Sequence, residues 1–385
     1  MKTIDSFNIL KKYCEKEDYK GWDPYDGLNS KVFNATPLKN NWFCRLLMIQ
    51  LFKRNPFNLR YLFGIDKDYN AKGIGLFVQG YVNLCKIDKD KYISKLKYVA
   101  DLLVELQSTG YHGACWGYNF PWQRRKDFLF PSYTPTVVAT NFCATALFEA
   151  YEITKDERYL NIALTSADFV LKDLHRSKVE GGEMFSYSPL PGHDTVFNAS
   201  LLGSRILSYC YKYTKKEEYK DAARSSVAAC CHYQQEDGSW AYGIKETDSW
   251  IDSFHTGYNL DGLIAYEELC DDKSFHENII KGFEYYVKNF FLENGEPKYY
   301  NKQQYPIDIH CPGQLFVTLS RLHKFKEYET LAEKVLQWTE NNMQDKKGYF
   351  YYQLKKGISS KIPYMRWSNA FMFCALTYFL IEKSK

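Results

Sequence analysis

Two short motifs hold side chains that could transfer protons during a reaction. In DSWIDSFHTGYNLDGL and in IDIH, the groups with this ability are Asp252, His255, Tyr258, Asp308 and His310. A pair of carboxyl groups can serve as the general acid and base of glycoside hydrolysis, which makes Asp252 and Asp308 the first-choice pair for that reaction. Removal of a proton beside a carboxylate, as in a lyase or a C5-epimerase, would instead use His255, His310 or Tyr258 as the base.

A structural role is the alternative for each of these groups. Asp252 precedes a predicted helix start near Phe254, where an N-cap carboxylate is common. Their positions nevertheless favour a functional role. IDSFH and IDIH occupy matching places in successive repeats, and GHDTVFN puts His193 and Asp194 at a third such place.

Other side chains are suited to holding a sugar. Aromatic residues form 17% of the chain, with 33 Tyr and 8 Trp, and flat aromatic faces stack against ring-shaped ligands. Arginine can hold a carboxylate through two parallel hydrogen bonds. The predicted substrate-binding residues are Trp116, Trp122, Arg125, His193, Asp194, Trp240, Trp250, Arg366 and Trp367. Two alternatives stay open: the aromatic segments could be strands that only cover the fold, and the RRKD turn around Arg125 could be a solvated surface turn.

Composition narrows the classes of partner. The net charge is +4 and Lys and Arg form no long block, so no nucleic-acid partner is expected. No apolar run approaches the length of a membrane span, and the N-terminus lacks the apolar stretch of a signal peptide. The 11 Cys are scattered, many in apolar helical stretches, which indicates a reducing cytoplasm. No Cys and His spacing matches a zinc site, so neither a metal nor a cofactor is expected.

A repeat of about 56 residues organises the helices that must position these groups. Helices that are apolar almost all round can be anchored at Phe142, Phe197, Phe254, Cys311 and Trp367, with spacings of 55, 57, 57 and 56 residues. Such helices must be enclosed by others, and the helices between them carry only one apolar stripe. One repeat is therefore a helical hairpin with an inner and an outer helix.

A closed ring follows if the ends of the chain meet. Residues 72–87 add a sixth inner helix, and the last inner helix, 367–383, has no outer helix after it. The sequence predicts one all-α domain over residues 1–385, in which an N-terminal helix packs against 367–383. That helix is either 42–52 or the one before it.

The long loops all run from an outer helix to the next inner helix. In a ring they emerge on one face, which is where function collects. They are expected to carry short β-pieces and most candidate residues, and they span 110–138, 176–197, 236–253, 293–310 and 345–366.

Six hairpins closing into a ring resemble the (α/α)6 toroids of six-hairpin glycosidases, polysaccharide lyases and uronyl epimerases. The segments WGYNFPWQ, TPTVVATNF, DSFHTGYNLDGL, PIDIH and RWSNAFMF are also similar to those of bacterial proteins associated with surface-polysaccharide gene clusters. The resemblance implies a carbohydrate-active enzyme for an oligosaccharide or polysaccharide that contains uronate, first of all a glycoside hydrolase in surface-polysaccharide metabolism. The alternatives are a polysaccharide lyase or uronyl C5-epimerase, and a non-catalytic glycan-binding toroid. The catalytic motif of the unsaturated-uronyl hydrolases is not found here.

Overall fold

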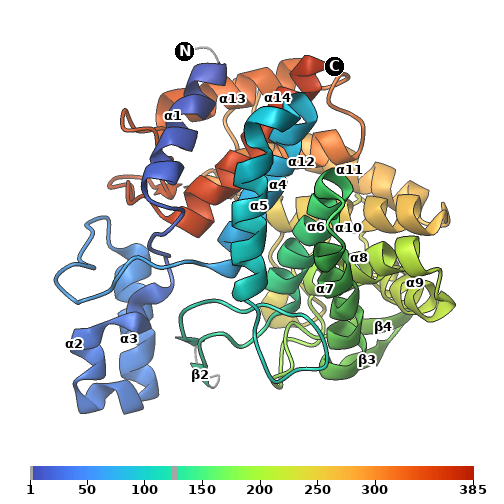
Figure 1. Ribbon diagram of the computed structural model, residues 1–385, viewed down its shortest axis with the longest axis horizontal. Coiled ribbons are helices and arrows are strands. Elements are labelled where there is room, and N and C mark those ends of the chain that lie inside the picture. Colours follow the sequence, from blue (N-terminus) through green and yellow to red (C-terminus); the bar gives the residue numbers. More distant parts are fainter. Residues whose placement is uncertain (1–2, 124–128) are drawn as a thin grey trace.

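Six inner helices form a closed ring in the computed structural model, which describes residues 3–123 and 129–385. Each inner helix contacts the next, and the last contacts the first (Figure 1). The ring consists of α4 (Ala71–Ile87), α6 (Val137–Thr154), α8 (Phe197–Thr214), α10 (Ser253–Cys270), α12 (His310–Arg321) and α14 (Phe371–Ser384). The predicted all-α (α/α)6 toroid is thereby confirmed.

The outer helices surround this ring and bury one stripe each, as their sequences predict. In α5, for example, the buried residues are Leu96, Val99, Ala100 and Leu103, which lie on one side of a helix with 3.6 residues per turn. The outer helices are α5 (Lys89–Glu105), α7 (Glu157–Asp168), α9 (Glu217–His232), α11 (His276–Phe290), α13 (Glu329–Met343) and α1 (Thr3–Lys16). A π-helical turn (η3, Phe169–Asp173) extends α7, and another (η5, Met365–Ala370) precedes α14.

Three of the turns from inner to outer helices are short and alike. After α6, α8 and α10 the C-cap residue adopts the left-handed conformation, with φ of 56° at Lys155, 55° at Lys215 and 50° at Asp271. This conformation ends a helix sharply by letting the next N–H bond back to the last turn. The opposite face is therefore left with all the long loops.

Short antiparallel strand pairs lie in those long loops, as the sequence predicts. They are β1 (Trp122–Gln123) with β2 (Leu129–Phe130), β3 (Arg176–Val179) with β4 (Gly182–Phe185), and β5 (Ile307–Asp308) with β6 (Gln353–Leu354). The last pair joins the loops of two neighbouring repeats, which ties the segment before α12 to the segment before α14.

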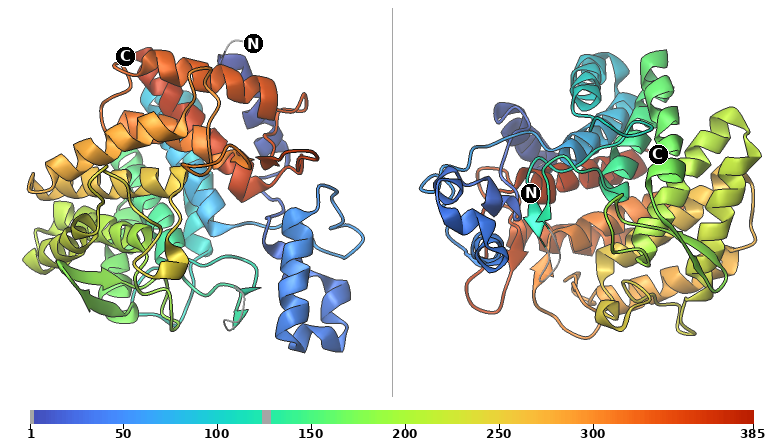
Figure 2. Two further views of the ribbon diagram at one scale, coloured as in Figure 1. Left: turned by 180° about the vertical axis from the view of Figure 1, so that it is seen from behind. Right: turned by 90° about the horizontal axis from the view of Figure 1, so that it is seen from below.

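The first helix of the chain, α1, is the one that contacts the last inner helix. Phe7 of α1 packs against Phe373 of α14, with ring centroids 5.2 Å apart. The alternative helix, α3 (Trp42–Arg54), contacts η1 (Asp26–Asn29), η2 (Pro37–Asn40) and β1 instead. The helices α3, η1, η2 and α2 (Lys31–Asn34) form a lobe beside the ring, which we call the N-terminal lobe (residues 26–65; Figures 1 and 2).

No helix in the described ranges has the length and apolar character that crossing a membrane requires.

Candidate active site

The N-terminal ends of the inner helices bring the candidate residues together on the long-loop face. Contacts link them from helix to helix: the Lys72 ammonium of α4 lies 4.2 Å from the ring centroid of Phe142 in α6, and that ring lies 5.4 Å from Tyr258 in α10. The Tyr258 ring in turn lies 6.0 Å from that of His255. Segments distant in sequence thus converge on one aromatic-lined mouth, which we call the ring mouth.

Asp252 holds His255 in a fixed orientation. As the N-cap of α10, Asp252 accepts a hydrogen bond from the His255 backbone N–H through Oδ1 at 3.0 Å. Its Oδ2 lies 2.7 Å from His255 Nδ1 and accepts the indole N–H of Trp250 at 3.1 Å. The carboxylate is 1% exposed and the imidazole 21%. Because the carboxylate keeps a proton on Nδ1, the ring leaves Nε2 as the nitrogen that can accept a proton.

A small cavity lies beside this pair. It is a narrow cleft bordered by His255, Tyr242, Asn198 and Asn259, among others. The side-chain oxygens of both asparagines are buried and accept no hydrogen bond from the described residues. Buried acceptors without donors are rare, so these two oxygens are suited to accept hydrogen bonds from hydroxyl groups that reach this cleft.

Asp308 is fully enclosed by its hydrogen-bond donors. Its Oδ1 accepts from the His310 backbone N–H at 3.0 Å and from the Trp367 indole at 2.9 Å, and its Oδ2 accepts from Gln353 at 2.7 Å. The side chain is 0% exposed. Both predicted acid and base carboxylates, Asp252 and Asp308, therefore act in this structure as buried acceptors that position neighbouring side chains.

His310 is packed among aromatic rings. Its ring centroid lies 4.1 Å from that of Phe371, 4.5 Å from Trp367 and 5.1 Å from Phe254. Burial lowers the pKa of His310 to about 4, and the carboxylate of Asp308, 3.5 Å from Nδ1, offsets only part of that effect. The imidazole is thus neutral at physiological pH.

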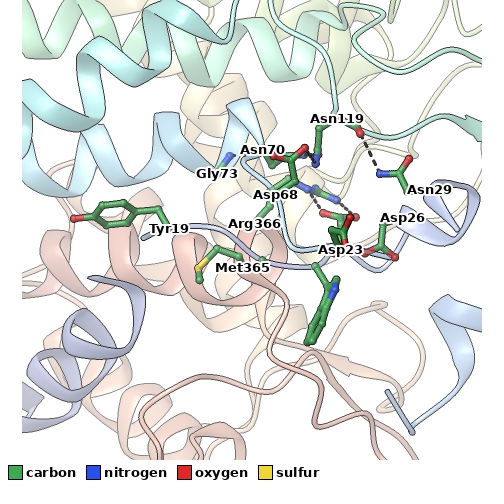
Figure 3. Close-up of a pocket in the computed structure, with 13 residues that line it drawn as sticks. Tyr19, Asp23, Asp26, Asn29, Asp68, Asn70, Gly73, Asn119, Met365 and Arg366 are labelled. Carbon is green, nitrogen blue, oxygen red and sulfur yellow. Dashed lines mark hydrogen bonds and ion pairs between the residues drawn. The ribbon is translucent and has the colours of Figure 1, made fainter. Parts of the chain in front are cut away.

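Arg366 is already paired with a carboxylate of the chain itself. Its Nε and Nη2 donate to the two oxygens of Asp23 at 2.5 and 2.7 Å, and both side chains are buried (Figure 3). The pocket next to this pair also contains Asp26, Asp68 and Asn70. The prediction that Arg366 binds a substrate carboxylate therefore does not match the structure, because Asp23 occupies the guanidinium and the adjoining wall is acidic.

Lys72 is the functional candidate that the sequence reasoning missed. It lies in the first turn of α4, is 4% exposed, and has its Nζ 3.4 Å from the hydroxyl of Tyr258. No carboxylate of the described residues lies within ion-pair distance of it. Burial, followed by the charge of Arg366, lowers the pKa of Lys72 well below its usual value. A signal was present in KGIGLFVQGYVNLCKI: Lys72 opens a largely apolar helix, whereas the only other lysine of this segment, Lys86, lies at its end.

Two of the predicted tryptophans lie in the core instead of at the mouth. The indole N–H of Trp116 donates to the Leu103 carbonyl at 2.9 Å, and that of Trp240 donates to the Cys230 carbonyl at 3.0 Å. Trp116 is 0% and Trp240 2% exposed. Both rings anchor a long loop onto the preceding outer helix, so neither offers a free face to a sugar.

The other three tryptophans are half-buried. Trp250 stacks on Tyr242 with ring centroids 4.4 Å apart and planes at 16°, and Trp122 stacks on Phe130 at 4.2 Å and 9°. Trp367 donates to Asp308 and contacts Tyr25 with centroids 5.7 Å apart. These indoles retain exposed surface for stacking.

The remaining predicted residues form a neighbouring group. His193, with φ of 56°, lies 6.1 Å from Tyr187 and 6.5 Å from Phe130 between ring centroids. Asp194 follows it and has one buried carboxylate oxygen that accepts no hydrogen bond from the described residues. Arg125 lies outside the described residues. Among the residues that the structure describes, no group of three or more His, Cys, Asp or Glu is placed to hold a metal ion.

Comparisons with known proteins agree on the fold. Neither a family model nor a curated protein sequence matches the chain. The chain is similar to the solved structure of the GH76 α-mannanase of Bacteroides thetaiotaomicron, with a TM-score of 0.63, 12% identity, and coverage of 84% of this chain and 90% of that one. The cellobiose 2-epimerase of Bacillus thermoamylovorans matches with a TM-score of 0.63 and 12% identity, over 82% of this chain and 88% of that one. An unsaturated glucuronyl hydrolase specific for heparin matches with a TM-score of 0.58 and 15% identity, over 82% of this chain and 87% of that one. The chain therefore has the toroid that glycosidases and sugar epimerases share.

Proposed function

We propose that this chain is a carbohydrate-active enzyme that removes and returns a proton at a sugar carbon beside a carbonyl or carboxyl group. This is the chemistry of sugar epimerases and isomerases. The observation that carries the proposal is the contact of 2.7 Å between Asp252 and His255 Nδ1, which presents Nε2 as a positioned base at the ring mouth.

The neighbouring groups suit the charge that such a reaction develops. Loss of a proton beside a carbonyl places negative charge on the oxygen, and a nearby cation or hydroxyl donor stabilises it. Lys72 and the Tyr258 hydroxyl, 3.4 Å apart, supply both kinds of group next to His255. The unpaired acceptors of Asn198 and Asn259 would bind sugar hydroxyls, and Trp250 offers a stacking face.

Hydrolysis by two carboxylates is supported less well. A general acid or a nucleophile must reach the glycosidic bond, whereas Asp252 and Asp308 are sealed by three donor contacts each. The shared toroid does not decide the matter, because a fold hosts many chemistries. The arrangement of side chains is what favours proton transfer.

An acidic sugar is the substrate class that we favour. A buried ammonium without a carboxylate partner is expensive unless it is neutral or meets an anion from outside the chain. Lys72 is such a group, and we assign to it the carboxylate-binding role that was predicted for Arg366. The predicted role in surface-polysaccharide metabolism and the predicted cytoplasmic location stay predictions.

Exchange of solvent deuterium tests the proposal. The protein is incubated in D₂O with uronates, uronate-containing oligosaccharides and neutral aldoses, and deuterium at carbon is followed by NMR. We expect exchange at the carbon beside the carbonyl or carboxyl group. His255→Asn should lower kcat at least about 100-fold, and Asp252→Asn by about 100- to 10,000-fold with a smaller change in KM, because the base loses its orientation.

The chain offers a matched control for the two substitutions. His112 contacts Asp173 through Nδ1 at the same 2.7 Å on the protein surface, so His112→Asn should leave turnover unchanged. New reducing ends without deuterium at carbon would show that the reaction is hydrolysis. An ultraviolet-absorbing unsaturated uronate would show that it is elimination. Either result would refute the proposal. Binding without any conversion over the whole panel would make the chain a glycan-binding toroid.

A further inference from the structure

The N-terminal lobe exposes most of the large apolar side chains on the described surface. Of the 17 large hydrophobic residues with high exposure, nine lie between Val32 and Leu62. They include Trp42, Phe43, Leu47 and Leu51 on α3. Single exposed apolar residues are ordinary, but a concentration of them within one small lobe marks an interaction surface.

The helix α3 has an apolar side chain row on each of two faces. Ile49 and Phe52 are buried toward the body of the lobe. Phe43, Leu47 and Leu51 follow one another at intervals of four residues and are 51%, 52% and 41% exposed. Residues with this spacing lie on one side of a helix. A helix that is apolar on both sides is normally covered on both, so this row lacks a cover within the described chain.

The charge of the lobe is one-sided. Between Gly27 and Ile65 the sequence contains no Asp or Glu, but it contains Lys31, Lys39, Arg45, Lys53, Arg54 and Arg60. Arg60 is buried against Asp26, and Lys31 pairs with Asp66 just outside this stretch. Lys39 precedes the apolar row in the sequence and Arg54 follows it, and both are exposed. A chain with a net charge of only +4 thus concentrates positive charge in the segment that carries the apolar row, and Lys39, Arg45, Lys53 and Arg54 form no ion pair with a carboxylate of the described residues.

We propose that the N-terminal lobe docks on the surface of an anionic lipid bilayer, with α3 lying in the plane of the interface. The apolar row and Trp42 would enter the boundary between headgroups and acyl chains, and the basic side chains would meet the anionic headgroups. A second copy of the chain fits less well, because it would bring the same positive charge against itself. The inference does not depend on the reaction catalysed at the ring mouth.

Vesicle co-sedimentation of the full chain tests this docking. Two kinds of vesicle are compared, phosphatidylcholine alone and phosphatidylcholine with about one third phosphatidylglycerol. We expect binding to the anionic vesicles that weakens as salt rises from about 50 to 500 mM, because screening reduces the attraction. The double variant Phe43→Ser with Leu47→Ser should bind at least about tenfold more weakly, since it loses two inserted apolar side chains.

A control variant replaces exposed apolar side chains that lie outside the N-terminal lobe. Ile87→Ser with Ile358→Ser changes two exposed apolar residues outside the lobe and should bind vesicles like the unaltered chain. Both double variants should unfold at the temperature of the parent, because the changed side chains are exposed. Absence of binding to anionic vesicles at low salt would overturn the proposal. So would equal loss of binding in the two double variants, or a dimer that Phe43→Ser with Leu47→Ser dissociates while no vesicle binding occurs.

Discussion

Replacing His310 by phenylalanine is expected to flatten the pH dependence of the free energy of unfolding between pH 7 and pH 4. The phenyl ring of the variant H310F would keep the aromatic contacts with Phe371, Trp367 and Phe254 while removing the titratable group. In the parent chain burial lowers the pKa of His310 to about 4, whereas an imidazole in the unfolded chain titrates near about 6.5.

The direction of the effect follows from which state binds the proton first. As the pH falls below about 6.5 the unfolded chain takes up a proton at His310, and the folded chain does so only near pH 4. The stability linked to this group is complete above the unfolded pKa and is lost as the pH falls towards the folded one. Each pH unit between the two values corresponds to about 1.4 kcal/mol, so about 3 kcal/mol is lost in all.

Urea unfolding at half-unit steps from pH 7 to pH 4 measures the effect. The free energy of unfolding of the parent should fall by about 3 kcal/mol more than that of H310F over this range. The slopes of the two curves against pH should differ most near pH 5, by the equivalent of about one bound proton. Phe371→Leu is the control: it loosens the same cluster but keeps the imidazole, so its curve should lie below that of the parent and parallel to it. If the curves of the parent and H310F stay parallel within about 1 kcal/mol, His310 is not held neutral by burial and the reasoning fails.

Three further predictions test the other assignments. Lys72→Met should raise the free energy of unfolding by about 1 to 3 kcal/mol, because it removes a buried amine that no carboxylate of the described residues pairs with, and calorimetry should show weaker binding of acidic sugars with little change for neutral ones. Deleting residues 1–18 removes α1 and should abolish cooperative unfolding in a thermal scan; an unchanged transition would mean that α1 does not close the ring. Trp240→Ala should lower stability by about 3 to 5 kcal/mol, whereas Trp250→Ala should mainly weaken sugar binding, and equal stability losses in the two variants would contradict their different burial.

The fold could be predicted from the sequence because its signal repeats. The anchors Phe142, Phe197 and Phe254 recur at nearly constant spacing, and each opens or lies within a helix that is apolar all round. Enclosed helices on that spacing leave few arrangements other than a ring of hairpins. The end of the repeat was less regular, since the expected helix over 367–383 begins with the π-helical turn η5 and continues as α14 to Ser384.

The sequence placed the candidate residues on the long-loop face but could not show which of them are accessible. Asp252 and His255 are three residues apart at a helix start, so a local N-cap geometry already brings the carboxylate to the imidazole. The extent to which an indole ring in a long loop is buried is not set by its neighbours in the sequence. Trp116 and Trp250 both stand in long loops, and only packing against the outer helices buries the first while leaving the second half-exposed.

The sequence by itself determined the ring of hairpins, the face on which the long loops gather, and the position of Asp252 at a helix start, because each follows from periodicity or from a local helix signal. Only the tertiary structure decided which charges are free. Arg366 is occupied by Asp23, a residue 343 positions away, and Lys72 reaches Tyr258 from 186 positions away without meeting a carboxylate of the described residues. Partners at such separations are chosen by how the ring closes and how its mouth packs, and the resulting burial sets which side chain can still receive a substrate.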